Sequence, residues 1–187
     1  MHVHKDFAFY HIPKTGGTSI RKLLHMTRLP FKQVTKDHVP ITTRKGKRCL
    51  KKYKYIYTNI RDPFARVVSL HQFSTRSREI EFKEFFHERW FLNPKNLDWL
   101  KSMEEFLLID GKVPENITIV KLEEIDKVWP KIIKKHFGLE ISLLPRENTT
   151  IHREPMEYFD EEMIEKVKQK EGWILKYYES SYSKGVC

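Results

Sequence analysis

The sequence predicts an α/β protein in which a mostly parallel sheet lies between helices as a three-layer sandwich, within a single domain over residues 1–187. Three segments carry this prediction, because each joins a short apolar run to a helical pattern that follows it. The apolar runs are residues 7–10, 53–60 and 117–120. Strands that alternate with helices along a chain pair in parallel, and the connecting helices cover the sheet.

The first strand-to-helix segment contains a turn with the composition of an anion-binding loop, which makes the segment similar to a P-loop. The apolar run ends at Tyr10, and helical spacing begins near Ile20. The turn between them holds the residues expected to bind a phosphate-like group, which are Pro13, Lys14, Thr15, Gly16, Gly17, Thr18 and Ser19. Glycine lets the backbone approach an anion, a helix start directs free N–H groups at it, and Lys14 adds positive charge. The alternative is a Gly-rich turn that binds nothing.

The turn does not match the loop of the ATPases, G-x-x-x-x-G-K-[ST], in which the lysine follows the last glycine. Lys14 instead precedes Gly16 and Gly17. The dinucleotide pattern G-x-G-x-x-G does not fit the turn either.

The second strand-to-helix segment places an arginine where ligands collect in open α/β sheets. Arg61 follows the strand expected over residues 53–60, Asp62 suits a helix N-cap, and Pro63 suits the first helical position. Ser69 then lies about 9 Å along the helix axis from Pro63, at ~1.5 Å per residue, so the long side chain of Arg61 can share an anion with it. The alternative for Arg61 is a salt bridge at the end of the strand. Arg66 lies on the same helix face as Ser69. It either assists with that anion or forms an exposed ion pair.

Two motifs resemble those of the sulfotransferases that use 3′-phosphoadenosine 5′-phosphosulfate. The run PKTGGTS resembles their 5′-phosphosulfate loop, and RDPFARVVS resembles their 3′-phosphate segment. The nearest likeness is the branch with the heparan sulfate 2-O- and 6-O-sulfotransferases and small bacterial relatives. The resemblance implies that this donor is a co-substrate, that Lys14 acts in catalysis, and that Arg61 and Ser69 bind the 3′-phosphate. It implies no metal.

Transfer to a hydroxyl requires a general base, and histidine titrates in the suitable range. The branch places a catalytic histidine between the two motifs, which implies His38, with Asp37 as its neighbour in the chain. An exposed loop histidine is the alternative. His11 borders the turn and is the reserve candidate, whereas His2 and His4 are expected in a mobile terminus.

Composition and charge limit the binding partners and the cellular location that the sequence predicts. The net charge of +10 includes a dense basic stretch over residues 44–54, which is either a solvated loop, a guide for an acidic glycan or the nucleotide, or a nucleic-acid surface. Nucleic acid ranks last, because no known recognition motif is visible. No apolar run predicts a membrane span or a signal peptide, and Cys49 and Cys187 lack metal spacing. These features predict a cytoplasmic protein.

The rest of the chain is expected to be mainly helical. Residues 81–109 form a helical region broken at Asn93-Pro94, and its aromatic side chains are expected mostly in the core, with one or two free to line an acceptor cleft. A helix over residues 123–137 ends at Gly138, and Asp160 caps a last one.

Together these features predict a sulfotransferase that acts on a hydroxyl of a carbohydrate or small metabolite, including anionic ones. Two alternatives stay open. One is a P-loop-like nucleotide kinase, which would need Mg²⁺. The other is an inert nucleotide-binding protein. A position of His38 far from the loop would favour this alternative.

Overall fold

The computed structural model describes residues 1–35, 38–75, 79–145 and 153–180. Its contacts divide the chain into two compact units. We call them the sheet unit, Met1–Arg61 with Phe106–Thr149, and the helical unit, Asp62–Glu105 with Thr150–Cys187. The predicted α/β class is confirmed. The single domain over residues 1–187 stays a prediction.

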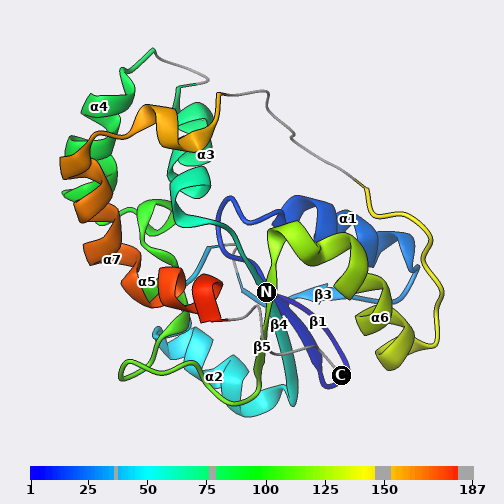
Figure 1. Cartoon of the computed structure of the whole chain (residues 1–187). Coiled ribbons are helices and arrows are strands. Elements are labelled where there is room, and N and C mark those ends of the chain that lie inside the picture. The colour runs from blue at the N-terminus through cyan, green and yellow to red at the C-terminus, as the bar shows by residue number, and fades with distance from the viewer. Residues whose placement is uncertain (36–37, 76–78, 146–152, 181–187) are drawn as a thin grey trace. The chain divides into compact units, whose positions relative to one another are not determined.

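The sheet unit is built on one open sheet of five strands in the order β3-β1-β2-β4-β5 (Figure 1). The strands are β1 (His2–His4), β2 (Phe7–Tyr10), β3 (Lys32–Gln33), β4 (Tyr55–Ile60) and β5 (Ile117–Lys121). The three strands expected from the sequence, β2, β4 and β5, pair in parallel. β1 is antiparallel to both β2 and β3, so the complete sheet is mixed, and the predicted parallel pairing is confirmed for part of it.

The amino terminus belongs to this sheet, which corrects the expectation of a mobile end at His2 and His4. β1 lies between β2 and β3, and the amino group of Met1 donates to Thr35 Oγ1 at 2.8 Å. Both Met1 and His2 are buried. The sequence gives no sign of this strand, because three residues with one central valine are too short for a periodic pattern.

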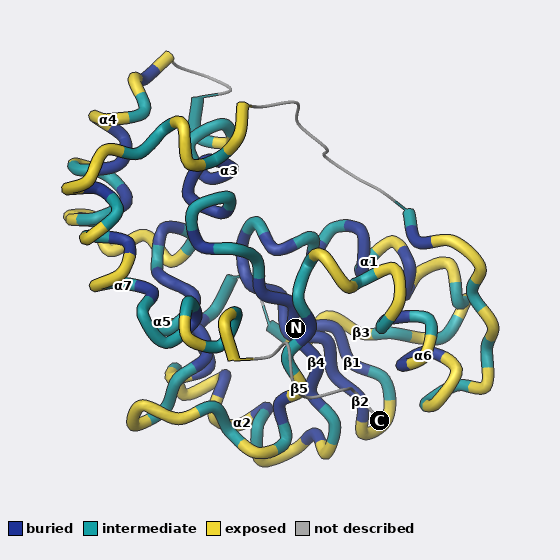
Figure 2. Tube along the Cα trace, in the orientation of Figure 1, coloured by how far each residue is buried: buried dark blue, intermediate teal, exposed yellow. Residues whose placement is uncertain are grey.

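One face of the sheet is covered by α1 (Gly17–Met26) and α6 (Ile125–Phe137), which follows the short 3-10 turn η3 (Leu122–Glu124). Figure 2 shows the buried strands. The buried side chains of this core are Phe7, Phe9, Ile20, Leu23, Leu24, Tyr57, Val120, Trp129, Ile132, Ile133 and Leu144. Gly138 ends α6 at a positive φ of 69°, as the sequence predicts.

The basic stretch forms the helix α2 (Arg44–Lys52), which corrects the expectation of a solvated loop. The helix begins because Thr43 caps it, with Thr43 Oγ1 accepting a hydrogen bond from Gly46 N at 3.1 Å. Gly46 packs so closely that a Cβ there would lie 2.5 Å from the backbone of Ile41. The cap and this close approach fix the helix on the sheet unit.

The helical unit contains two longer helices and several short ones. Its elements are α3 (Pro63–Ser74), α4 (Phe82–Glu84), the π-helix η1 (Phe85–Phe91), the 3-10 helices η2 (Asp98–Leu100) and η4 (Pro155–Tyr158), the start of α5 (Met103–Leu107), and α7 (Glu161–Ser180). Asp62 and Asp160 cap α3 and α7, as predicted, by accepting from Ala65 N and Met163 N. Within the residues that the structure describes, no helix is long and apolar enough to cross a membrane.

Aromatic side chains form much of the core of this unit, as expected. Phe85, Phe86 and Trp90 are fully buried, while Phe91 and Trp99 are partly buried against them. The helical region expected over residues 81–109 is divided into short pieces, because it includes the π-helix η1 and the turns around Asn93 and Asn96, both at positive φ.

Candidate active site

The turn between β2 and α1 contains two residues in left-handed backbone conformations. Lys14 and Gly16 both adopt left-handed conformations, with φ of 64° and 78°. Gly16 is the N-cap of α1 and, as a glycine, makes no side-chain hydrogen bond that caps this helix. Turns that alternate in handedness direct successive N–H groups into one concavity, which favours an anion. A left-handed non-glycine residue costs on the order of 1 kcal/mol, so Lys14 is held in a strained conformation.

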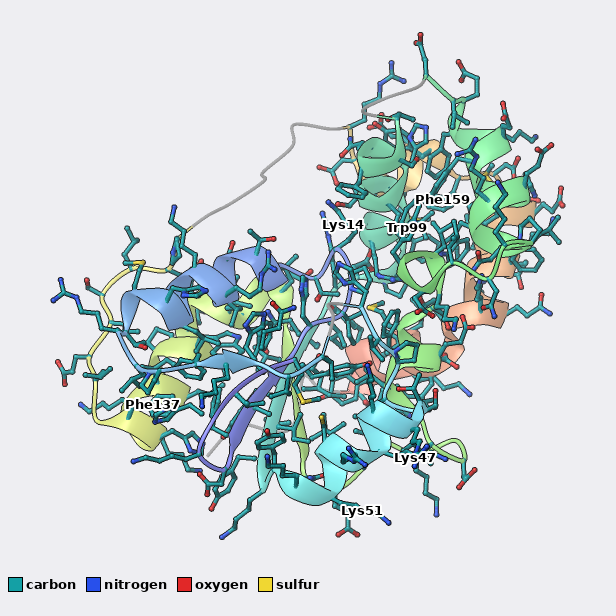
Figure 3. The ribbon with its side chains drawn as sticks, turned by 180° about the vertical axis from the view of Figure 1, so that it is seen from behind. Lys14, Lys47, Lys51, Trp99, Phe137 and Phe159 are labelled. Carbon is teal, nitrogen blue, oxygen red and sulfur yellow. The ribbon has the colours of Figure 1, made fainter. Side chains whose placement is uncertain are left out.

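The side chains of the turn divide into structural and accessible groups. Thr15 is fully buried, and its hydroxyl donates to Ile12 O at 2.9 Å, so it can serve a ligand only through its backbone. Pro13 and Ser19 are also buried, whereas Lys14 and Thr18 are partly exposed. Figure 3 labels Lys14 at this turn. The exposed ammonium and hydroxyl groups therefore come from Lys14 and Thr18.

His11 forms one wall of the turn. Its ring is buried and stacks on Phe9, with centroids 6.0 Å apart and an interplanar angle of 18°. A Cβ at Gly17 would lie 1.8 Å from His11 Cδ2, so only glycine fits at this position. The second glycine of the pair is thus required by packing against His11.

His38 lies directly against that wall. Its ring meets the ring of His11 with centroids 4.7 Å apart and planes inclined at 62°. The following segment is fixed near the end of β2, because Tyr10 Oη donates to Val39 O at 3.0 Å. The structure therefore brings His38 to the loop. Asp37, its expected neighbour, lies outside the described residues.

Sequence reasoning missed Asn59, a fully buried residue of β4 that faces the turn. Its Oδ1 accepts a hydrogen bond from Trp129 Nε1 at 2.9 Å, and this contact fixes the orientation of the amide. Its Nδ2 has no hydrogen-bond partner among the described residues and lies 4.0 Å from where a Cβ of Gly16 would be. An unpaired buried donor is costly, and this one lies beneath a loop suited to an anion. A lone asparagine in a strand gives no such signal in the sequence.

Arg61 and Ser69 belong to different units. Arg61 follows β4 as the last residue of that part of the sheet unit and is partly exposed. Ser69 lies in α3 of the helical unit, where it is buried. Their shared contact with a 3′-phosphate stays a prediction.

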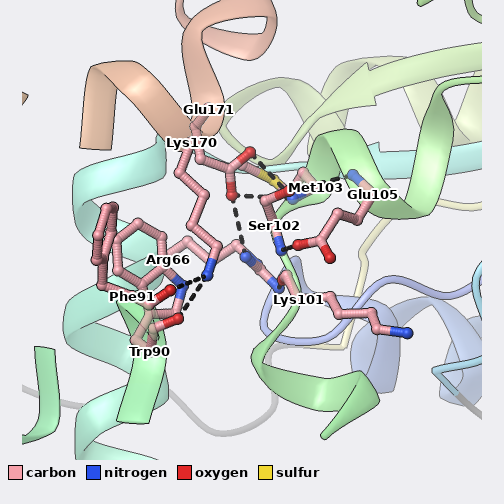
Figure 4. Close-up of polar contacts among 9 residues, drawn as sticks. All are labelled: Arg66, Trp90, Phe91, Lys101, Ser102, Met103, Glu105, Lys170 and Glu171. Carbon is pink, nitrogen blue, oxygen red and sulfur yellow. Dashed lines mark hydrogen bonds and ion pairs between the residues drawn. The ribbon is translucent and has the colours of Figure 1, made fainter. Parts of the chain in front are cut away.

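Arg66 does not form the expected exposed ion pair, because its side chain is fully buried (Figure 4). Its Nη1 donates to Glu171 Oε1 at 3.2 Å and its Nη2 donates to Lys101 O at 2.9 Å. Glu171 also accepts from Met103 N, at 2.9 and 3.0 Å to its two oxygens. Glu171 interrupts α7 with φ of −130° and ψ of 25°. Arg66 therefore contributes to the interior of the helical unit.

Burial raises the pKa of Glu171 from its ordinary value of 4.5 to about 7, although the nearby Arg66 charge and the Met103 N–H lower it. Desolvation is therefore the larger effect on this carboxyl. Neighbouring Lys170 donates to the carbonyls of Trp90 and Phe91 at the end of η1, and burial lowers its pKa.

Among the described residues, no group of three or more His, Cys, Asp or Glu side chains is placed to hold a metal ion. A comparison of the chain with protein-family models finds no match, and a comparison with curated proteins finds none either.

Proposed function

We propose that this protein is a sulfotransferase that moves a sulfuryl group from 3′-phosphoadenosine 5′-phosphosulfate to a hydroxyl of a carbohydrate or small metabolite. The observation that supports it most is the contact of His38 with His11, which packs against Gly17 of the loop. This contact supports the proposal because it brings the His38 ring close to the loop that we propose binds the donor. We also propose that the fold is a three-layer sandwich and that the turn between β2 and α1 binds phosphate.

The proposed donor site uses groups whose charge and position suit two anionic ends. The backbone N–H groups at the start of α1, with Lys14 and Thr18, bind the 5′-phosphosulfate, since the N-cap Gly16 has no side chain to cap this helix. Ser19 supports the same end, as the motif implies. Arg61 and Ser69 bind the 3′-phosphate and so distinguish this donor from ATP and AMP. The buried amide of Asn59 lies beneath the loop and is suited to help bind the 5′-phosphosulfate.

The donor supplies a sulfuryl group whose bond to the 5′-phosphate oxygen breaks as the acceptor oxygen bonds to sulfur. His38 accepts the proton that the acceptor hydroxyl loses. Lys14 stabilises the negative charge that develops on the leaving phosphate oxygen, a role comparable to that of an oxyanion hole. The products are the sulfate ester, 3′-phosphoadenosine 5′-phosphate and a proton held on His38.

The direct experiment incubates the full chain with radiolabelled donor and a library of carbohydrates and small alcohols. We expect labelled product with the parent protein and none with Lys14→Ala, while circular dichroism shows that this variant is folded. A parallel reaction with ATP and Mg²⁺ tests the kinase alternative. Phosphate transfer without sulfuryl transfer would contradict the proposal, and donor binding without any turnover would favour an inert binding protein.

A further inference from the structure

We propose that the outer face of α2 is a second anion site, which takes a small molecule carrying several phosphate groups. The site does not depend on the proposed sulfotransferase activity. It depends on four cationic side chains, on the hollow between them and on the rigid attachment of the helix.

The four cations share one face of α2. Arg44, Lys47, Arg48 and Lys51 stand at positions i, i+3, i+4 and i+7, so they lie in a row about 10 Å long, at ~1.5 Å per residue. With Thr42 they line an open hollow of about 510 Å³. Figure 3 labels Lys47 and Lys51 on this helix. The volume falls within the ordinary range of small-molecule sites, roughly 300–1,000 Å³.

The positive charge of this face is not balanced within the described part of the protein. None of the four side chains forms an ion pair with a described carboxylate, and α2 contains no acidic residue. Like charges at i,i+4 positions destabilise a helix, and α2 has two such pairs, Arg44–Arg48 and Lys47–Lys51. An anion in the hollow removes this repulsion.

The cations are held on a fixed support. Thr43 caps the start of α2, Gly46 packs against the backbone of Ile41, and Asn116 Nδ2 donates to Leu50 O and Tyr53 O at 2.9 Å. These contacts anchor both ends of the helix. Binding therefore orders only side chains, which reduces its entropic cost.

The lining identifies the class of ligand. It contains no aromatic ring on which a nucleobase can stack and no carboxylate that would repel an anion. Guanidinium groups match phosphate oxygens in pairs, and lysine is a point charge for the same groups. The ligand is therefore charged over its whole surface, as an inorganic polyphosphate or a polyphosphorylated polyol is.

The hollow is separate from the turn at Lys14. α2 ends at Lys52 and leads into the amino end of β4, beginning at Tyr55. β2 and β4 are parallel, with Phe7 opposite Tyr55 and Tyr10 opposite Thr58. The turn follows the carboxyl end of β2, so the two sites can be tested independently.

The test measures binding of inorganic tripolyphosphate and of inositol hexakisphosphate to the full chain by calorimetry, without metal and at about 0.15 M ionic strength. We expect the double variant Lys47→Gln/Lys51→Gln to bind at least one of them about tenfold more weakly than the parent. The control is Lys131→Gln/Lys135→Gln, which removes the same charge from exposed i,i+4 positions of α6 and should change binding by less than about twofold.

Preference for tripolyphosphate or for the polyol identifies the source of the phosphate groups, and either preference supports the site. Equal weakening in both double variants would show a response to net charge and overturn the proposal. Absence of binding by the parent would overturn it as well. Tighter binding of duplex DNA than of either probe, at the same salt, would replace it with a nucleic-acid surface.

Discussion

The imidazole rings of His11 and His38 contact each other at the edge of the turn, with centroids 4.7 Å apart and planes at 62°. His11 is buried between Phe9 and Gly17, whereas His38 is partly exposed. The two rings therefore have different roles in the proposed mechanism. His11 maintains the shape of the loop, and His38 is available to an acceptor.

Replacing His38 with alanine is expected to lower turnover by about 10²–10⁴-fold with little change in donor affinity, because the proposed mechanism uses the ring as general base. Turnover of the parent should rise between about pH 5.5 and 8.5, as imidazole becomes neutral. His11→Ala should instead weaken donor binding, since it removes a wall of the loop. Steady-state kinetics of both variants across this pH range separates the roles. Near-parent turnover in His38→Ala would place the base elsewhere.

Gly17→Ala is expected to weaken donor binding and reduce activity, because the added methyl group collides with His11 at 1.8 Å. The matched control is Gly172→Ala in α7, where a Cβ meets no atom within 4 Å. That control should keep activity and gain roughly 0.5–1 kcal/mol in unfolding free energy, since glycine inside a helix is unfavourable. Calorimetric binding and chemical denaturation of both variants check this. Parent-like donor affinity in Gly17→Ala would show that the position of His11 does not matter to the loop.

Asn59→Asp is expected to weaken the binding of 3′-phosphoadenosine 5′-phosphate about ten- to a hundredfold. The change keeps an acceptor for Trp129 Nε1 but replaces the buried donor beneath the loop with an acidic group. Asn116→Asp is the control, because it makes the same change at the amino end of β5 and breaks hydrogen bonds to Leu50 O and Tyr53 O. That variant should lose stability but keep nucleotide affinity. Equal affinities in Asn59→Asp and the parent would remove Asn59 from the proposed site.

Glu171 is expected to make the protein less stable as pH rises from about 4.5 to 7. Its pKa is about 7 in the folded protein against 4.5 ordinarily, so within this window the unfolded chain releases a proton that the folded chain retains. The full difference corresponds to about 3 kcal/mol in unfolding free energy. Glu171→Gln removes this titration.

Denaturation curves of the Glu171→Gln variant and the parent should therefore coincide near pH 4.5. At pH 8 the variant should be more stable, by up to about 3 kcal/mol. A less stable variant at pH 8 would show that the charged pair with Arg66 stabilises the helical unit more than burial of its carboxylate costs.

The sequence predicts those parts of the fold that local signals determine. The apolar run before the turn, the Asp62-Pro63 start of α3 and the glycine after α6 each act within a few residues, and each is confirmed. β1 and β3 were missed, because their stability comes from pairing with other strands. The helix α2 was missed because its charged outer face resembles that of a solvated loop.

In the candidate site, too, the features that local signals determine could be predicted, whereas contacts between distant residues could not. The strand, turn and helix around Lys14 could be predicted from the order of residues. The packing of His11 on Gly17 could not, because it depends on the path that the backbone takes through the turn. Arg66 and Glu171 are 105 residues apart, so their buried pair leaves no local pattern, and the sequence predicted instead an anion contact or an exposed ion pair for Arg66. The candidate role of Asn59 could be recognised only in the structure, because the hydrogen bond from Trp129 determines the direction of its amide.

The central claim is that the protein binds a 3′-phosphorylated adenosine donor, and calorimetry with 3′-phosphoadenosine 5′-phosphate and with AMP tests it most directly. The parent should bind the bisphosphate more tightly, and Arg61→Ala should bind it about ten- to a hundredfold more weakly than the parent, since a charged hydrogen bond contributes roughly 1.5–3 kcal/mol. Affinity of Arg61→Ala for AMP should stay close to that of the parent. Equal affinities of the parent for the two nucleotides would contradict the account.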